Sequence, residues 1–149
     1  MEIIFSRDCD YEKIYLHLLE CKDNFVPPLN ERVELRDFAK KIHDNAITFC
    51  AIDNHNLVGL VSCYFNNGAY GFINHVSVLS KYKRLGIAIR LMEMCIDYAL
   101  ENSYSLLCLE VDSDNKAAIV LYTKVGFEIK DNNSNCIEMN KAINLEGLD

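Results

Sequence analysis

A chain of 149 residues suits one domain, which would bury roughly two-thirds of the surface that the unfolded chain exposes. Apolar residues make up 50% and charged residues 25%, which argues against a disordered chain. The net charge of −7 argues against a nucleic-acid partner, and no apolar run approaches the roughly 20 residues of a membrane helix. The first residues also lack the basic start and apolar centre of a secretory signal. We therefore expect a single domain over residues 1–149, located in the cytoplasm.

The first quarter of the chain predicts a short strand, two helices and a stiff connector. Residues 2–5 form the strand, and Asp8 or Asp10 can cap the helix that follows. Pro27 and Pro28 exclude both a helix and a central strand, so they predict an extended connector. A second helix is expected over about 33–43.

The centre of the chain predicts an antiparallel meander. Three apolar stretches predict strands, over residues 47–52, 57–65 and about 70–79. Polar residues 53–56 form the first turn, and Asn66-Asn67-Gly68 forms the second, since Asn-Gly accepts positive φ angles.

The last part of the chain predicts two more helices and three strands. One helix follows Gly86 and ends near residues 102–103, and the other runs over about 115–124. The strand over 105–111 is apolar at nearly every position, which predicts helices on both of its faces. Two closing strands, over 127–130 and 136–140, complete the chain.

Seven cysteines are an odd number, form no C-x-x-C pair and mostly have apolar neighbours. They are Cys9, Cys21, Cys50, Cys63, Cys95, Cys108 and Cys136. This pattern predicts buried free thiols in a reducing compartment, with no disulfide framework and no metal site. A catalytic cysteine is the minor alternative.

The stretch from Val78 to Ala88 runs from an apolar strand through a basic turn into a helix. Unpaired N–H groups and the dipole of a helix N-terminus attract an anion such as a pyrophosphate. Gly86 and Ala88 are small enough to let phosphate oxygens approach, and Lys83 and Arg84 add cations beside them. The alternative is an ordinary turn with a solvated basic tip.

A second motif, with Asn115, Ala118, Leu121, Tyr122, Gly126 and Phe127 in residues 109–127, decides between these interpretations. Together, the two motifs resemble the signatures of the GNAT acyltransferase superfamily. Lys83, Gly86 and Ala88 stand where the family has Arg or Gln, Gly, and Gly or Ala, so lysine is a departure. The second signature is matched at Asn115, Ala118, Leu121, Tyr122, Gly126 and Phe127. The order and separation of the two signatures are those of the family, and the resemblance covers residues 1 to about 140.

The resemblance implies a mixed α/β (α+β) fold, with a mostly antiparallel sheet of six or seven strands flanked by about four helices. It also implies an N-acetyltransferase with acetyl-CoA as co-substrate. The acceptor would be a primary amine of a small molecule or a peptide terminus, attacking directly in a ternary complex. A homodimer is possible, and no nucleic-acid or membrane partner is expected.

The alternative to an enzyme is a protein of another functional class, an inactive acyl-CoA-binding or regulatory module. A nucleotide-binding protein is disfavoured, because the sequence contains no G-x-x-x-x-G-K-[ST] motif.

An amine acetyltransferase needs a base for the ammonium proton and an acid for the departing thiolate. Glu110 is the predicted base, because burial in an apolar strand would raise its pKa toward neutrality. The alternatives are a structural ion pair for Glu110 and His75 as a rival base. By resemblance, Tyr122 would be the acid; otherwise it is a core tyrosine.

The resemblance also assigns the groups that bind acetyl-CoA. Main-chain groups of Val76, Ser77 and Val78 would bind the pantetheine arm and the thioester carbonyl, and Asn115 would contact the cofactor or simply begin its helix. The diphosphate would lie on a turn made of Lys83, Arg84, Leu85, Gly86, Ile87, Ala88 and Ile89. The strand before this turn and the strand of Glu110 would have to diverge, which the sequence does not show.

Overall fold

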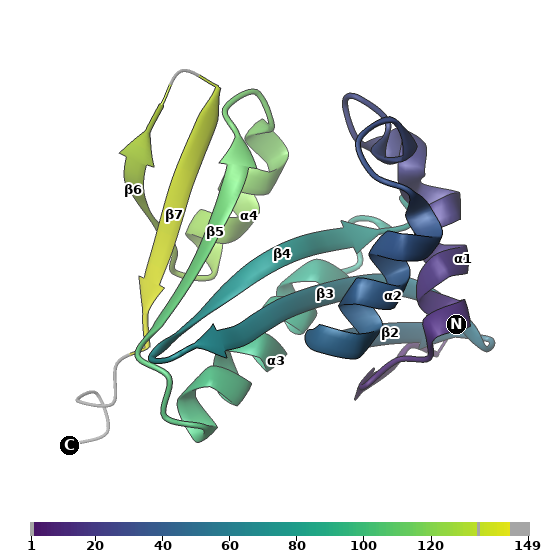
Figure 1. Cartoon of the computed structure of the whole chain (residues 1–149), viewed down its shortest axis with the longest axis horizontal. Helices are drawn as coiled ribbons and strands as arrows, with labels where there is room; N and C mark the ends of the chain where they lie inside the picture. The colour runs from purple at the N-terminus through teal and green to yellow at the C-terminus, as the bar shows by residue number, and fades with distance from the viewer. Residues whose placement is uncertain (1, 134, 144–149) are drawn as a thin grey trace.

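A single seven-stranded sheet organises the protein in the computed structural model, which describes residues 2–133 and 135–143 (Figure 1). The strand order is β1-β2-β3-β4-β5-β7-β6, and all neighbours are antiparallel except β4 and β5. The strands are β1 (Ile4–Arg7), β2 (Ile47–Asp53), β3 (Asn56–Asn67), β4 (Tyr70–Val78), β5 (Leu106–Asp112), β6 (Glu128–Asn132) and β7 (Cys136–Ala142). The helices are α1 (Tyr11–Cys21), α2 (Leu35–Asn45), α3 (Ile87–Glu101) and α4 (Lys116–Lys124). The predicted fold class and the central meander are confirmed.

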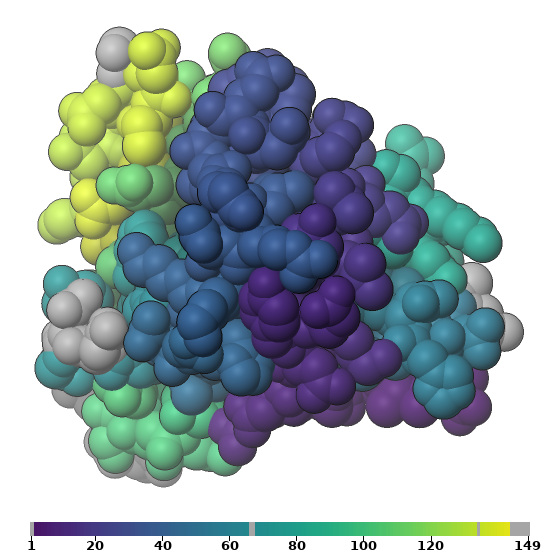
Figure 2. Space-filling view, turned by 45° about the vertical axis from the view of Figure 1, so that its right-hand side comes forward, coloured from purple at the N-terminus to yellow at the C-terminus, as the bar shows by residue number. Residues whose placement is uncertain are grey.

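Helices cover the sheet from both sides, and the alternation of strand residues explains why. In β2, Phe49 and Ala51 belong to the core under α3, whereas Cys50 points to the core under α1 and α2. The space-filling view shows α1, the connector and α2 as a continuous cover, with β6 and β7 beside it (Figure 2). Two apolar cores therefore form, one on each face of the sheet.

The N-terminus of α3 lies close against β3 because residue 59 is glycine. A Cβ atom at Gly59 would lie 2.8 Å from Cγ2 of Ile87 and 3.1 Å from a methyl carbon of Leu91. A larger residue at this position would force the side chain of Ile87 to shift. This contact fixes the start of α3 at the end of β4, where the predicted phosphate turn begins.

The parallel strands β4 and β5 pair over only four residues and then diverge (Figure 1). Pairing ends at Ile73 and Leu109. At the same point β4 carries a bulge, because Ser62 faces His75 and Cys63 faces Ile73, which leaves Asn74 as the extra residue. The Ser62 hydroxyl donates a hydrogen bond to Oδ1 of Asn74 at 2.7 Å. A bulge bends its strand and increases the local twist, so it accounts for the divergence.

The expectation that helices cover both faces of β5 is wrong. Leu107, Leu109 and Val111 are buried under α3 and α4, but Glu110 on the opposite face is exposed. Helices α1 and α2 lie over β2, β3 and β4 and do not reach this part of the sheet. The apolar run over residues 105–111 therefore alternates between a covered and an open face.

Helix boundaries differ from the predictions by one or two residues. Helix α2 begins at Leu35, because the Glu34 carboxylate accepts hydrogen bonds from the N–H groups of Arg36 and Asp37 at 2.6 and 3.1 Å. Asp10 precedes α1 but makes no side-chain cap. Within the described ranges, no helix combines the length and apolar character needed to cross a membrane.

Candidate active site

The start of α3 offers unpaired N–H groups to a ligand. Gly86 is the N-cap residue and provides no side-chain hydrogen bond to the first turn. The first backbone bond of the helix runs from the N–H of Arg90 to the oxygen of Gly86, at 3.1 Å. The N–H groups of Ile87, Ala88 and Ile89 therefore lack partners within the helix, which is the arrangement that binds anions.

The backbone of the turn before α3 is held in an uncommon conformation. Gly86 has φ of +79°, and a Cβ atom there would meet no atom within 4 Å, so the space beside it is open. Arg84 has φ of +67°, which costs a non-glycine residue about 1 kcal/mol. The Tyr82 hydroxyl donates to Asp53 at 2.6 Å and anchors the turn to β2. Lys83 and Arg84 are exposed and form no ion pair among residues 2–133 and 135–143.

Beyond the divergence, one edge of β4 has no neighbouring strand. Val61, Leu60 and Gly59 of β3 pair with Val76, Ser77 and Val78 on the other edge. The pairing with β5 ends at Ile73, so alternate main-chain groups of Asn74–Val78 face the space where the strands separate. Such an edge can bind an extended ligand as an added strand does.

The exposed face of β5 and β7 carries two carboxylates directly opposite each other. Glu110 pairs with Glu138 in the strand register, and the next pair along the same face is Cys108 with Asn140. Burial raises the pKa of the Cys108 thiol, and the negative charges of Glu138 and Glu110 raise it further. Oδ1 of Asn140 is buried and has no hydrogen-bond partner among the described residues. The predicted burial of Glu110 is wrong, because its side chain lies on the open face of β5.

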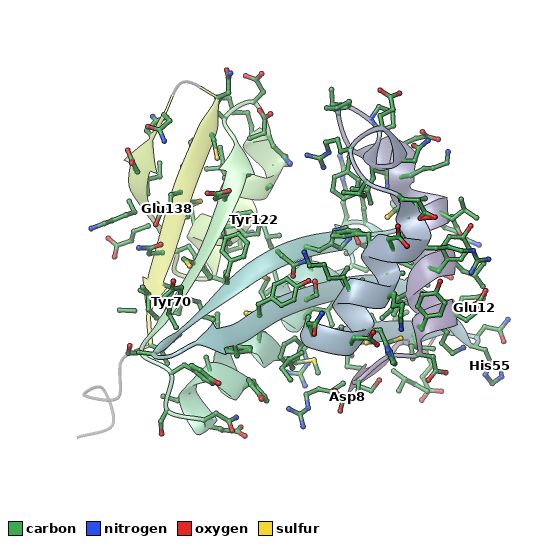
Figure 3. All side chains as sticks on the ribbon, viewed as in Figure 1. Asp8, Glu12, His55, Tyr70, Tyr122 and Glu138 are labelled. Atoms are coloured by element: carbon green, nitrogen blue, oxygen red, sulfur yellow. The ribbon has the colours of Figure 1, made fainter. Side chains whose placement is uncertain are left out.

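Tyr122 is buried on α4, in contact with the core under β5. Its ring centroid is 6.3 Å from that of Phe127, and 8% of the residue is exposed. Figure 3 shows its ring beside β5, on the side toward the space between β5 and β4. Burial raises the pKa of Tyr122 to about 12, so the phenol is protonated at neutral pH and can donate a proton.

Asn115 is the N-cap residue of α4. Its side-chain oxygen accepts a hydrogen bond from the N–H of Ala118 at 3.1 Å, and the residue is exposed. The sequence analysis gave two roles for Asn115, contact with the cofactor or the start of its helix, and the structure shows the second role. Among the described residues its side-chain amide N–H groups have no acceptor and are available to a ligand.

His75 lies apart from the carboxylates, on the face of β4 under α1 and α2. Nε2 of His75 and Nε2 of His17 each lie within hydrogen-bond distance of the Ser77 hydroxyl, at 2.8 and 2.7 Å. Burial lowers the pKa of His75 to about 3 and that of His17 to about 4. His75 is therefore a poor proton acceptor at neutral pH.

Sequence reasoning missed His17 and the side chain of Ser77. Two spacings could have found them. His17 and Cys21 are four apart on a helix, and His75 and Ser77 are two apart on a strand, so each pair shares one face of its element.

A cavity of about 530 Å³ lies away from all these groups, between α3 and the first two strands. Arg7, Phe49, Arg90 and Tyr98 are among its lining residues. It contains none of the predicted site residues, so cavity size does not mark the candidate site.

Comparison with protein families gives a match over most of the chain. The model of the Acetyltransferase (GNAT) family matches residues 11–127. The chain belongs to this family. The GNAT resemblance of the two sequence motifs is thereby confirmed.

Curated GNAT relatives with similar sequences are N-acetyltransferases. N-alpha-acetyltransferase 30 of Schizosaccharomyces pombe is 29% identical over 84 residues, covering 54% of this chain and 56% of the relative. Spermidine N(1)-acetyltransferase of Escherichia coli K12 is 31% identical over 121 residues, covering 71% of this chain and 59% of the relative. The chain spans about half the length of the curated relatives it matches.

Solved GNAT structures share the fold over nearly the whole chain. The ribosomal-protein-S18-alanine N-acetyltransferase of Escherichia coli has a TM-score of 0.79 at 20% identity, covering 97% of this chain and 96% of that one. The PaiA N-acetyltransferase of Thermoplasma acidophilum, in complex with coenzyme A, also has a TM-score of 0.79, at 14% identity, with coverages of 95% and 99%. At these identities the likeness establishes the fold alone.

Proposed function

We propose that this GNAT protein is an acetyl-CoA-dependent N-acetyltransferase, formed as one domain over residues 1–149. It would transfer an acetyl group to a primary amine of a small molecule or peptide terminus. The observation that carries the proposal is the open edge of β4, which leads directly to the unpaired N–H groups at the start of α3. An extended thioester with a diphosphate at one end matches these two features.

The turn over residues 83–89 supplies the proposed diphosphate site. The N–H groups of Ile87, Ala88 and Ile89 would donate hydrogen bonds, and Gly86 leaves open space for phosphate oxygens. The side chains of Lys83 and Arg84 have no partner of opposite charge among the described residues and would add positive charge. Leu85 is half exposed and contributes its main chain.

The main chain of Val76, Ser77 and Val78 would bind the pantetheine arm along the open edge of β4. One N–H of this edge would donate to the thioester carbonyl oxygen and stabilise the negative charge that develops there. Asn115 would contact the same ligand through its side-chain amide, while its oxygen caps α4.

Glu110 and Tyr122 would move the two protons of a direct transfer. Glu110 is exposed, so it would accept the ammonium proton directly or through a water molecule. The amine nitrogen then bonds the carbonyl carbon, the carbon–sulfur bond breaks, and the Tyr122 hydroxyl gives its proton to the thiolate. The nitrogen loses its second proton as the amide forms, and this proton restores the Tyr122 hydroxyl. His75 is less suited to act as the base, because burial lowers its pKa to about 3.

The face beside Glu110 favours a cationic acceptor. Glu110 and Glu138 are like charges in direct cross-strand contact, which is unfavourable unless a cation lies between them. The unpartnered oxygen of Asn140 lies on the same face and could accept a hydrogen bond from an N–H group. Both features suit an ammonium substrate, consistent with the amine spermidine in the name of one relative. The cytoplasmic location and a possible homodimer stay predictions.

An acetyl-transfer assay tests the proposal. Thiol release from acetyl-CoA would be measured against polyamines, amino acids, amino sugars, aminoglycosides and peptides with free N-termini. We expect release with at least one amine and a matching mass increase of one acetyl group. Thermal stabilisation by acetyl-CoA without any transfer would favour the inactive binding module. Stabilisation by ATP but not by CoA would overturn both.

A further inference from the structure

Three potential metal ligands meet under the helices on one side of the sheet. His17 and Cys21 come from α1 and His75 comes from β4, and their ligand atoms all lie within 4.8 Å of one another. The exposed fractions are 2%, 0% and 6%, so all three side chains are inside the protein. The proposed acetyl transfer uses none of them.

Two elements aim these side chains at the same place. On α1, residues four apart lie on one face, so His17 and Cys21 both point toward the sheet. On β4, His75 and Ser77 are two apart and point toward α1. The group therefore joins the helix to the strand whose edge borders the divergence.

The hydrogen bonds of His17 fix its tautomer, so that the Nε2 lone pair points toward Cys21 and His75. Nδ1 of His17 must carry a proton, because it donates to the main-chain oxygen of Leu57 at 2.9 Å. Nε2 is then an acceptor, and the Ser77 hydroxyl donates to it at 2.7 Å. Metal-binding histidines are held in this way, with the second ring nitrogen donating to a carbonyl or carboxylate.

The Ser77 oxygen lies where both imidazoles converge. Since the hydroxyl has one proton, which it gives to His17, Nε2–H of His75 must donate to the Ser77 oxygen, at 2.8 Å. Rings of Phe25 and Phe38 lie 5.5 and 5.8 Å from the ring of His75 and form an apolar wall. The Cys21 thiol donates weakly to the main-chain oxygen of Leu18, at 3.8 Å, and its sulfur also lies beside the Ser77 hydroxyl.

We propose that His17, Cys21 and His75 bind one divalent transition-metal ion of the zinc type, with the Ser77 oxygen or a water molecule as the fourth ligand. Two imidazole nitrogens and one sulfur favour zinc over magnesium or calcium, which prefer oxygen ligands. Tetrahedral zinc bonds place the ligand atoms about 3.3–3.6 Å apart, so the side chains would close by about 1 Å. On binding, Cys21 releases its thiol proton to solvent as the metal–sulfur bond forms. The proton on Nε2 of His75 moves to Nδ1 of the same ring, which frees the Nε2 lone pair for the metal.

Such an ion would link α1 to β4 and stabilise the cover over this face of the sheet (Figure 2). The sequence predicted no metal site, because it contains no C-x-x-C pair. The proposed site instead combines a helical His-x-x-x-Cys with a strand histidine that is distant in the sequence.

Cobalt(II) titration of the purified, metal-free chain tests the site, because a thiolate bound to cobalt gives a charge-transfer absorption. We expect this band to saturate at one equivalent, to disappear when zinc is added, and to be unaffected by magnesium. Binding of zinc should also raise the melting temperature. Absence of the band and of any zinc-dependent stabilisation in the wild-type chain would overturn the proposal.

Two matched variants locate the ion. Cys21→Ala removes a buried thiol but keeps a small apolar side chain, and we expect it to lose the band. Cys136→Ala removes a thiol on β7, outside the group, and should keep it. Far-UV circular dichroism checks that both variants are folded, and Cys21→Ser replaces Cys21→Ala if the latter is not. A band that persists in the folded Cys21 variant would place the metal elsewhere and overturn the assignment.

Discussion

Strands β4 and β5 are neighbours in the sheet, run in the same direction, and yet place their titratable residues in opposite environments. His75 of β4 is covered by α1 and α2, and burial lowers its pKa to about 3. Glu110 of β5 is exposed, because the same helices do not extend beyond the divergence. The layer above a strand, rather than the residues beside it in sequence, decides what its polar side chains can do.

The largest loss of activity is expected when the proposed acid, Tyr122, is replaced. This residue lies on the β5 side of the divergence. Tyr122→Phe should lower kcat by ~10² to 10⁴, because the departing thiolate loses its proton donor, with little change in acetyl-CoA affinity. Steady-state kinetics and calorimetric titration measure the two quantities. Tyr98→Phe makes the same change on α3 and should leave kcat unchanged. Unchanged turnover in Tyr122→Phe would remove this residue from the mechanism.

Substitution of the proposed base, Glu110, tests the comparison of the two strands directly. Glu110→Gln should lower kcat by ~10², with the largest loss at the acidic end of the pH profile, where most of the acceptor is protonated. Glu93→Gln, an exposed change on α3, is the control. If His75→Ala produces this pH-dependent loss and Glu110→Gln does not, the base lies on β4 and the assignment must be exchanged.

The buried histidines predict how stability depends on pH. Between pH 6.5 and about 4, the unfolded chain binds protons on His17 and His75 while the folded chain does not. The free energy of unfolding should therefore fall as the pH falls through this window, by at most about 3 kcal/mol for His17.

Urea unfolding at several pH values measures this slope, with a chelator present. His17→Gln should flatten it, whereas His55→Gln, at an exposed turn, should not. An equal slope in all three proteins would mean that the histidines are not buried as neutral groups.

A smaller effect is expected at the start of α3, the end of the path along β4. Gly86→Val fills the open space beside the first turn and should weaken acetyl-CoA binding ~10-fold, because phosphate oxygens can no longer approach the main chain. Gly68→Val is the matched control. Its φ is +74° and its surroundings are equally open, so it carries the same backbone cost away from the site. Equal affinity in both variants would argue against a diphosphate at Gly86.

The sequence predicted the elements well, because each has a local signal. The meander follows from strands bounded by turn residues, and α3 follows from its apolar face after Gly86. The burial of Glu110 was predicted wrongly, since the run from Leu106 to Val111 is apolar on both faces of β5 while only one face is covered.

The divergence of β4 and β5 could not be predicted. It depends on one extra residue, Asn74, in the register between β3 and β4, and no local pattern marks that residue. The group of His17, Cys21 and His75 likewise depends on packing between elements that are far apart in sequence. The two GNAT motifs indicated where a cofactor would bind, but the environment of each side chain required the fold.

A crystal structure of the chain with bound acetyl-CoA would test the central claim most directly. The account predicts the diphosphate on the N–H groups of Ile87, Ala88 and Ile89, and the thioester between β4 and β5 within reach of the Tyr122 hydroxyl. Acetyl-CoA bound at any other place, or no binding at a saturating concentration, would contradict it.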